Sequence, residues 1–287
     1  MTTTHPADVL VSPAWVADRL DRFREPTPDY RLVEVDVNTD FYRERHAPGA
    51  VGFDWQADLQ SDTWRDIPTP AEFERLMGDN GIANDTTVVV YGDNANWFAT
   101  HLYWQFSIYG HDDVRVMDGG REYWLEHGFP TTDEVPTFPA TEYHVETTDE
   151  SIRAFRRDVH EALDAETTLI DVRMPEEYRG ELIAPPGMDE TAQRAGHIPG
   201  AINVLWADNV GSDGRFKPLA VLADLYESHG VTPDDAVIAY CRIGERSSIT
   251  WFVLHELLGY DRVQNYDGSW TEWGNLVRAP VAVGDEE

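Results

Sequence analysis

Short apolar runs alternate along this chain with longer amphipathic segments, and turns rich in glycine, proline and polar residues separate them. Bounded apolar runs are typical of buried strands, whereas apolar residues recurring every three or four positions predict helices. The predicted strands cover residues 31–37, 86–91, 114–117 and 236–240. The predicted helices cover about 13–20, 69–77, 97–109 and 248–258, with a short turn or helix at 41–46. This alternation predicts an α/β fold with helices on both faces of a parallel sheet.

The same order of elements occurs twice. The turn His46-Ala47-Pro48-Gly49-Ala50 recurs as His197-Ile198-Pro199-Gly200-Ala201. Landmark residues also recur at a constant spacing of 149 positions, in the pairs Tyr91/Tyr240, Gly110/Gly259, Asp118/Asp267, Gly119/Gly268 and Trp124/Trp273. We therefore infer an internal duplication, with one domain over 9–129, a second over 151–282, and a linker over 130–150 that is rich in Thr, Pro and acidic residues.

Histidines in both copies of the Pro-Gly turn favour a structural hydrogen-bonding role over a catalytic one. His46 lies in the copy that has no cysteine, so the chemistry of a thiol does not explain why a histidine stands there. His197 is its counterpart in the second copy.

The chain is strongly acidic. It has 53 Asp and Glu residues against 22 Lys and Arg, a net charge of −31, and Lys217 is its one lysine. Such a surface is a poor partner for nucleic acid or an anionic membrane. Because the carboxylates are spread along the whole chain, we expect adaptation to high salt, which screens their mutual repulsion.

Cys241 is the one cysteine, so the sequence excludes an intrachain disulfide and a cysteine-based zinc cluster, and it offers no spacing typical of a metal site. Residues 1–5 lack the pattern of a signal peptide. No apolar run approaches the ~18 residues of a membrane span. The simplest expectation is a cytoplasmic protein.

The cysteine opens the loop Cys241-Arg242-Ile243-Gly244-Glu245-Arg246-Ser247, between the strand at 236–240 and the helix that follows. Backbone N–H groups and the helix N-terminus in such a loop attract anions. Together with Arg242 and Arg246 they should lower the thiol pKa and favour the nucleophilic thiolate. Gly244 permits an unusual turn, and Ser247 is expected to cap the helix. The alternative is an inert, buried cysteine, which is the commoner role of a free thiol.

These motifs together resemble the tandem-domain rhodaneses, the thiosulfate and 3-mercaptopyruvate sulfurtransferases, over about residues 9–280. The motifs are an Asp-x-Arg strand end, the paired His-x-Pro-Gly-Ala turns, the Cys-x-x-x-x-Arg-Ser loop, and an Asp-Gly-(Gly/Ser) turn before Trp. The resemblance implies two rhodanese-like domains, each a parallel sheet with helices on both faces. It also implies a catalytically silent first domain, and Gly92 indeed stands opposite Cys241 at the spacing of 149.

The resemblance implies that Cys241 carries a persulfide and that amides of Arg242, Ile243, Gly244, Glu245, Arg246 and Ser247 cradle its outer sulfur. Arg242 stands where thiosulfate-type members carry a basic residue, which favours a dianionic donor. Arg246 is expected to hold the loop or the donor anion, or to form an ion pair with a carboxylate. Glu245 opposes a negative ligand and should raise the thiol pKa somewhat.

The resemblance also brings in the strand end at Asp171 and Arg173. Arg173 is expected to face the donor, with Asp171 tying down loops, or the two form an ion pair that fixes the fold. Family members often have Gly-Arg-aromatic shortly afterwards, but this chain has Glu177-Tyr178 and so places a carboxylate where a second cation is usual. Arg179 or Arg194 could supply the missing cation.

The expected reaction moves sulfur from a small anionic donor such as thiosulfate to cyanide or a thiol acceptor, through ping-pong steps and without an organic cofactor or metal. A 3-mercaptopyruvate sulfurtransferase, or a persulfide carrier with slow turnover, stays open because the loop chemistry is shared. A cysteine phosphatase is disfavoured because it needs Cys-x5-Arg, whereas this loop is Cys-x4-Arg.

Overall fold

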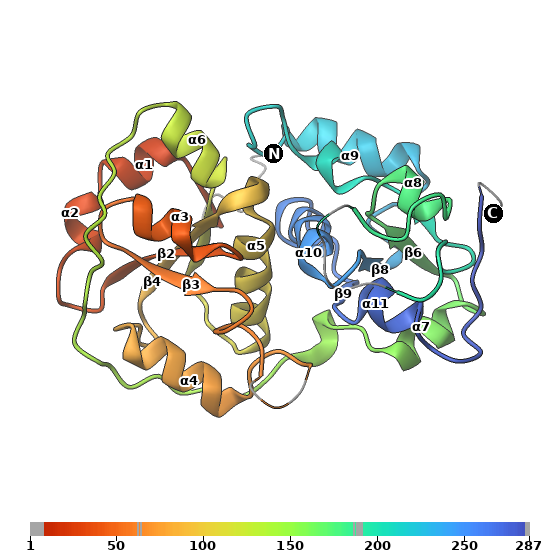
Figure 1. Cartoon of the computed structure of the whole chain (residues 1–287), viewed down its shortest axis with the longest axis horizontal. Coiled ribbons are helices and arrows are strands. Elements are labelled where there is room, and N and C mark those ends of the chain that lie inside the picture. Colours follow the sequence, from red (N-terminus) through yellow and green to blue (C-terminus); the bar gives the residue numbers. More distant parts are fainter. Residues whose placement is uncertain (1–8, 62, 64, 186, 188–191, 285–287) are drawn as a thin grey trace. The chain divides into compact units, whose positions relative to one another are not determined.

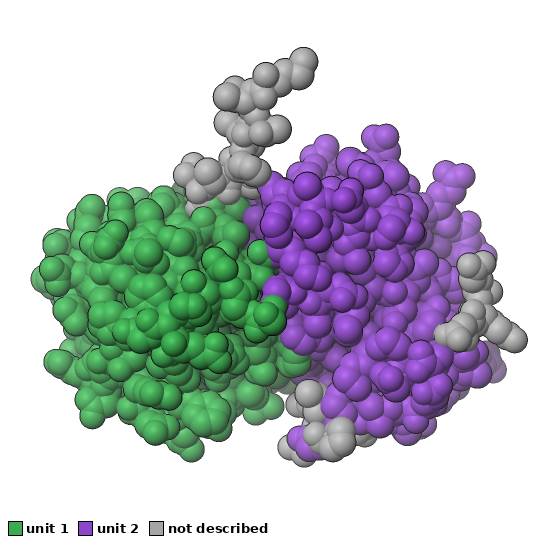
Figure 2. Space-filling view, turned by 90° about the horizontal axis from the view of Figure 1, so that it is seen from above, with its two compact units in different colours: residues 1–149, 212–216 green, residues 150–211, 217–287 purple. Residues whose placement is uncertain are grey.

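The computed structural model describes residues 9–61, 63, 65–185, 187 and 192–284. They form two compact units, coloured separately in Figure 2: Met1–Asp149 with Ser212–Phe216, and Glu150–Gly211 with Lys217–Glu287. Residues 1–5, on which the expectation about a signal peptide rests, lie outside the described residues. Within the described ranges, no helix is long and apolar enough to cross a bilayer, and no cluster of three or more His, Cys, Asp or Glu residues could hold a metal ion.

Unit 1 contains a parallel five-stranded sheet in the order β1-β5-β4-β2-β3 (Figure 1). Its strands are β1 (Leu10–Val11), β2 (Tyr30–Asp36), β3 (Ala50–Asp54), β4 (Thr87–Gly92) and β5 (Val114–Met117). Every residue of β4 is buried, as the continuous apolar run at 86–91 predicts. The two-residue β1 is too short to leave a periodic signal in the sequence, and it was not predicted.

Helices cover both faces of this sheet. They are α1 (Pro13–Ala17), α2 (Leu20–Phe23), α3 (Thr39–Glu44), α4 (Pro70–Asp79), α5 (Asp93–Ile108) and α6 (Gly120–Glu126). Side chains of α1, α2 and α6 form one buried cluster with Leu32, Val89 and Tyr91. Alternate strand residues such as Val88 and Val90 point to the opposite face, where α5 packs against β2, β4 and β5.

Unit 2 contains a parallel four-stranded sheet in the order β7-β6-β8-β9. Its strands are β6 (Thr167–Asp171), β7 (Ile202–Asn203), β8 (Ala236–Tyr240) and β9 (Val263–Tyr266). Its helical segments are η1 (Glu150–Ile152), α7 (Arg156–Ala162), α8 (Pro175–Tyr178), η2 (Trp206–Asn209), α9 (Leu219–Ser228), α10 (Glu245–Trp251), the π-helical η3 (Phe252–Leu257) and α11 (Ser269–Trp273).

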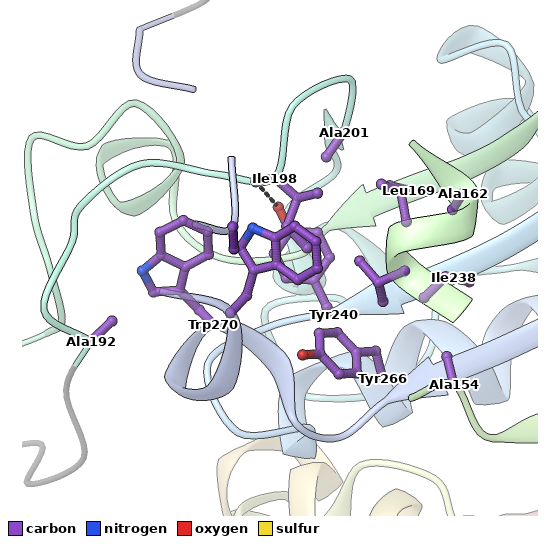
Figure 3. Close-up of a cluster of buried hydrophobic side chains, with 13 residues drawn as sticks. Ala154, Ala162, Leu169, Ala192, Ile198, Ala201, Ile238, Tyr240, Tyr266 and Trp270 are labelled. Carbon is purple, nitrogen blue, oxygen red and sulfur yellow. Dashed lines mark hydrogen bonds between the residues drawn. The ribbon is translucent and has the colours of Figure 1, made fainter. Parts of the chain in front are cut away.

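A buried cluster fixes one face of this second sheet. Figure 3 shows Tyr240 of β8, Tyr266 of β9 and Trp270 of α11 packed together, with Ala162 of α7 nearby. The Ile198 N–H donates a hydrogen bond to the Tyr240 hydroxyl at 3.1 Å. Since α10 contacts β8 and β9, the cysteine loop lies between a rigid strand and a helix that packs back on the sheet.

The predicted duplication is visible in matching contacts. His46 and His197 each stack on a tyrosine, Tyr42 or Tyr178, and the Nδ1 atom of each lies 2.7 or 2.8 Å from that tyrosine's carbonyl oxygen. The hydroxyl groups of the same tyrosines donate to the carbonyls of Ala50 and Ala201, as predicted for Pro-Gly turns held in place by hydrogen bonds. The structural role predicted for both histidines is confirmed.

The stretch 130–149, expected to be a linker, belongs to unit 1 and packs along it. The Thr141 N–H donates to the Gly78 carbonyl at 3.0 Å. Tyr143 is 4% exposed and lies edge-on to Phe73. The division between the units falls at Asp149–Glu150.

Candidate active site

The cysteine loop turns sharply between β8 and α10. Gly244 has φ +99°, a conformation that favours glycine, and a Cβ added there would lie 2.7 Å from the Asp267 Cα. The glycine is therefore required both by the backbone conformation and by close packing. Gly259 ends the helical segment with φ +72°, as predicted for a C′ glycine.

Cys241 is fully buried and is held by two hydrogen bonds at its sulfur and one at its backbone amide. The Gly244 N–H donates to Sγ at 3.1 Å, and the S–H donates to Glu245 Oε2 at 3.3 Å. The Cys241 N–H donates to the Ser269 hydroxyl at 3.1 Å. A sulfur atom in this position faces a backbone amide on one side and a carboxylate on the other.

The thiol pKa differs from expectation. The sequence predicts a lowered pKa, but burial raises the pKa of Cys241 and the charge of Glu245 raises it further. Arg246 and hydrogen bonds from Ser247 act in the opposite direction without reversing the result. The prediction of a ready thiolate was wrong because the sequence shows nearby cations but not the depth of burial. A raised pKa favours the thiol form of Cys241 over the thiolate.

Arg246 forms a buried, bidentate ion pair with Glu177 of α8. Its Nη1 and Nη2 atoms lie 2.9 and 3.2 Å from the two carboxylate oxygens, and the side chains are 2% and 0% exposed. Of the roles left open for Arg246, the structure therefore shows the ion pair with a carboxylate. Glu177, which seemed from the sequence to displace a useful cation, instead holds the loop cation in place.

Ser247 was predicted to cap the helix, but it does not. The helix begins at Glu245 rather than Ser248, with Gly244 at the N-cap and no side-chain capping bond. The Ser247 hydroxyl instead donates to the Gly244 carbonyl and lies 2.7 Å from Asn265 Oδ1. The helix begins three residues earlier than predicted because the tight turn at Gly244 allows it to start at Glu245.

The second and third loop positions are buried, and the second is fixed through its backbone. Arg242 and Ile243 are 5% and 6% exposed. The Arg242 carbonyl accepts from the N–H and the hydroxyl of Thr271, both at 3.0 Å. This ties the loop to the start of α11.

Arg173 is buried in an ion pair with Asp171. Its guanidinium donates to both Asp171 oxygens and, at 2.7 Å, to the Gly196 carbonyl, and it lies 4.6 Å from the Trp270 ring. Neither side chain is exposed, so of the two alternatives the ion pair that fixes the fold is present. Arg179 pairs with Glu181 at 2.9 Å, and Arg194 donates to the Ala279 carbonyl. Among the described residues, no hydrogen bond joins Arg173 to the cysteine loop.

The corresponding loop in unit 1 has a different chemistry. Asn94, Ala95 and Asn96 all have positive φ, and regular helix geometry begins at Trp97, as predicted. A Cβ added to Gly92 would lie 2.2 Å from the Val35 carbonyl oxygen. The loop borders a cavity of about 340 Å³ lined by Val37, Asn38, Phe41, Glu44, Arg45, Asp93, Asn94, Arg121 and Glu122.

Sequence reasoning missed two groups at the site, Ser269 and Asn265. Ser269 follows the Asp-Gly turn and has φ +50°; it anchors the Cys241 amide. Asn265 is fully buried on β9, and its amide donates to the Gly244 carbonyl at 3.1 Å. The signal for Asn265 was a polar residue in an otherwise buried strand, which needs a partner.

Comparisons with known proteins agree with this geometry. A "Putative thiosulfate sulfurtransferase" of Haloferax volcanii is 59% identical over 97% of both chains. The "Sulfur carrier protein TtuD" of Thermus thermophilus is 50% identical over the full length of both. The wild-type structure of EanB superposes with a TM-score of 0.85 at 27% identity, covering 100% of this chain and 72% of that one.

A related EanB structure, with a TM-score of 0.84 and 28% identity, contains a cysteine persulfide with ergothioneine and covers 98% of this chain and 72% of that one. The family model described as "Rhodanese-like domain" matches residues 12–127 and 156–276. The chain therefore belongs to the rhodanese-like family and carries two copies of its domain.

Proposed function

We propose that this chain is a thiosulfate sulfurtransferase that moves sulfane sulfur to cyanide or a thiol through a persulfide on Cys241. The observation that carries the proposal is the amide of Gly244, which donates to Sγ at 3.1 Å where the loop enters α10. Amides fixed around a sulfur atom stabilise negative charge on it, as the donors of an oxyanion hole do for oxygen. No metal or organic cofactor takes part in the proposed steps.

Two transfers make up the proposed reaction. The Cys241 thiolate attacks the outer sulfur of thiosulfate, a new S–S bond forms, and sulfite leaves with the electrons of the broken S–S bond. The resulting Cys–S–S⁻ then gives its outer sulfur to cyanide, forming thiocyanate and returning the thiolate. The amides of residues 242–247 are proposed to hold the outer sulfur between the steps, so the kinetics are ping-pong.

Thiosulfate is favoured as donor by Arg242 and by the name of the relative from Haloferax volcanii. A guanidinium next to the thiol suits a dianion. Arg173 and Arg179 are proposed to contribute to donor binding only through the carboxylates and loops that they fix, because both are engaged in ion pairs. 3-Mercaptopyruvate remains the alternative donor.

A second candidate function is a persulfide carrier that delivers sulfur to a protein partner. The relative from Thermus thermophilus, 50% identical over its full length, is named a sulfur carrier. The raised thiol pKa also favours slow turnover on small molecules. The same loop would serve both functions, so the distinction lies in rate and acceptor.

The deciding experiment measures thiocyanate formation with thiosulfate and with 3-mercaptopyruvate, in molar KCl, for the wild type and Cys241→Ser. Thiosulfate turnover that disappears in the variant is the expected result. Turnover with mercaptopyruvate alone would overturn the proposed donor. A stoichiometric persulfide detected by mass spectrometry, with negligible thiocyanate, would favour the carrier. Because Cys241 is the one cysteine, the persulfide has an unambiguous position.

We also propose that the chain is cytoplasmic and that its acidity is an adaptation to high salt. The net charge of −31 supports the second point, since screening weakens the repulsion among so many carboxylates. The melting temperature is expected to rise between low and molar KCl, and an unchanged melting temperature would contradict the adaptation.

A further inference from the structure

The carboxylate of Glu245 lies in direct contact with the atom that reacts. Glu245 is the first residue of α10 and is 1% exposed. Its Oε2 accepts the hydrogen bond from the Cys241 thiol at 3.3 Å, and its Oε1 lies 3.8 Å from Arg246 Nε. A carboxylate this close to a thiol, and accepting its proton in a hydrogen bond, meets the geometric requirement for a general base.

The charge of the buried cluster favours transfer of the proton inside it over loss of the proton to solvent. The groups ion-paired around the thiol are the carboxylates of Glu177 and Glu245 and the guanidinium of Arg246. Loss of the thiol proton to solvent would add a further negative charge beside them in a region shielded from water, which is costly. Transfer of the same proton from Cys241 to Glu245 creates the thiolate without changing the total charge.

The proton transfer also changes how Glu245 acts on the donor. An ionised carboxylate in the loop should repel a dianion. Once Glu245 holds the thiol proton it is neutral, and its O–H can donate a hydrogen bond to the sulfur. Glu177 keeps its bidentate contact with Arg246 throughout, so the loop cation does not lose its partner.

We infer that Glu245 is the catalytic base of this site, taking the proton of Cys241 when sulfur is accepted and returning it when the sulfur has been passed on. The inference deepens the proposed sulfur transfer and rests on it. In the first step, Cys–SH and Glu–COO⁻ become Cys–S⁻ and Glu–COOH. The thiolate then attacks the donor's outer sulfur, and sulfite leaves with the electron pair of the broken bond. After cyanide or a thiol has taken the outer sulfur, Glu–COOH returns its proton to the thiolate.

Of the five ionisable groups on the elements packed against α10, four have their own partners and the fifth, Asp208, is exposed. The elements packed against the helix are β8, β9, η2 and η3. Their ionisable residues are Tyr240, Tyr266, Asp208, His255 and Glu256. Tyr240 accepts from the Ile198 amide, Tyr266 donates to Glu272, and His255 pairs with Glu256. From outside these elements, Asp267 packs against Gly244 and is paired with Arg153. The interactions that the structure gives the Glu245 carboxylate are with Cys241 and Arg246.

The first test is single-turnover sulfite release from thiosulfate by Glu245→Gln. Glutamine keeps the shape of the side chain but accepts no proton. At pH 7 we expect the rate to fall by roughly 10²–10⁴-fold, the usual contribution of a positioned base. Glu227→Gln, an exposed substitution on α9, is the matched control and should leave the rate unchanged. A Glu245→Gln rate equal to or above that of the wild type would overturn the inference, because simple removal of a repelling charge would accelerate the reaction.

The second test does not depend on thiosulfate. Iodoacetamide alkylates the thiolate. Transfer of the proton from Cys241 to Glu245 exchanges no proton with the solvent, so the ratio of the Cys–S⁻/Glu–COOH pair to the Cys–SH/Glu–COO⁻ pair does not depend on pH. The alkylation rate of the wild type should therefore be nearly flat between about pH 6 and 8. In Glu245→Gln it should rise about tenfold per pH unit, as for an isolated thiol. A wild-type rate that rises as steeply as that of the variant would contradict the role of Glu245.

The two tests separate the two claims. A flat wild-type alkylation profile without sulfite release would mean that thiosulfate is the wrong donor while Glu245 remains the base. Glu245→Asp covers the case in which Glu245→Gln does not fold, because it keeps a carboxylate but places it farther from the sulfur. That variant should retain the flat profile and release sulfite at an intermediate rate. A steep profile in a folded Glu245→Asp variant, equal to that of the free thiol, would count against the inference.

Discussion

The two loops at the carboxyl ends of β4 and β8 occupy equivalent places in the two units, yet they use their amides differently. In unit 1, the Asp93 N–H donates to Asp36 Oδ1 at 2.8 Å, and the Asn94 N–H donates to Glu122 Oε1 at 3.2 Å. In unit 2, the Gly244 N–H donates to the sulfur of Cys241. The Ala95 N–H, which stands 149 positions before Gly244, donates to Glu122 Oε2 at 3.5 Å. A carboxylate of the chain itself thus accepts from the amide whose counterpart in unit 2 donates to the nucleophile.

The first loop differs from the second in its backbone as well as in lacking a cysteine. Three successive residues, Asn94, Ala95 and Asn96, have positive φ, which is uncommon for residues with a Cβ. The Gly92 N–H is also taken, by the side chain of Asn96. Unit 1 has the same parallel strands around the loop as unit 2, but the loop amides donate to side chains of unit 1 itself.

The largest predicted effect is that of Gly92→Cys, which would place the missing thiol in the first loop. The new Cβ would lie 2.2 Å from the Val35 carbonyl oxygen, so strand β2 or the loop has to move. We expect a loss of about 4 kcal/mol in the free energy of unfolding, in the range of severe overpacking. Urea unfolding measures it, and in a Cys241→Ser background we expect no sulfur transfer.

Ala95→Cys is the control for Gly92→Cys. It introduces the same thiol into the same loop at a position that already carries a Cβ, and its cost should stay below about 1 kcal/mol. Equal losses for the two variants would show that the thiol, rather than the closeness of Val35, causes the damage. Sulfur transfer by Gly92→Cys would show that the first loop is silent only for want of its nucleophile.

The next effect concerns the ion pair that distinguishes the second loop. Glu177→Gln removes the bidentate carboxylate from the buried Arg246, and removal of one member of a buried pair costs about 3 kcal/mol. Glu176→Gln, on the same helix but half-exposed and 3.8 Å from Arg179, should cost less than about 0.5 kcal/mol. Urea midpoints measured side by side in molar KCl decide the matter, and similar midpoints would mean that the buried pair stabilises nothing.

Local features of the second loop could be predicted from the sequence. A strand before Cys241, a special turn at Gly244 and a helix ending at Gly259 all follow from neighbouring residues, and all are present. The duplication and the role of His46 and His197 followed from spacing alone. The parallel sheets were predicted too, with β2, β4, β5 and β8 following from their apolar runs and β6 and β9 from the repeat. Strand β3 was not predicted, because it begins in the Pro-Gly turn. Strands β1 and β7 were also not predicted, because they carry too few residues for a pattern.

What the sequence could not give is the set of partners brought from far along the chain. Glu177 and Arg246 are separated by 69 positions, so the sequence could not show that a carboxylate in place of a usual cation neutralises the loop arginine. The prediction of a lowered thiol pKa failed because Arg242, Arg246 and Glu245 are all visible in the sequence, whereas the burial that raises the pKa most is not. Neighbouring residues in the sequence therefore predict the backbone conformation of the loop, whereas contacts between distant residues determine the partners and the pKa values of its charged groups.

A smaller effect is expected for Gly244→Ala in the second loop. The positive φ disfavours alanine, and the new Cβ would contact the Asp267 Cα, which together cost about 2 kcal/mol. Because the Gly244 amide would move away from Sγ, persulfide formation should fall by roughly tenfold or more. Gly230→Ala is the control: it also has positive φ, but nothing lies within 4 Å of the added Cβ. If Gly230→Ala lowered activity equally, the Gly244 amide would not be the cause.

The last comparison is between Asp36 of β2 and its counterpart Asp171 of β6. Burial raises the pKa of Asp36 to about 8, and the neighbouring Glu34 adds to the shift. Burial also raises the pKa of Asp93, to about 7, with Asp36 adding to it. The folded state thus keeps protons that the unfolded chain releases above about pH 4. Stability from Asp36 is therefore full below pH 4 and is lost as the pH rises toward 8, by up to about 1.4 kcal/mol per pH unit.

Asp36→Asn should remove this loss, because asparagine keeps the acceptor for the Asp93 amide and has no proton to release. The fall in unfolding free energy between pH 5 and pH 8 should shrink by at least about 1.4 kcal/mol relative to the wild type. Asp171→Asn should instead destabilise the protein at pH 8, since it takes the carboxylate from the buried guanidinium of Arg173. Urea unfolding at both pH values measures the two variants, and the same sign for both at pH 8 would mean that equivalent positions in the two units carry equivalent charge, contrary to the contrast between their loops.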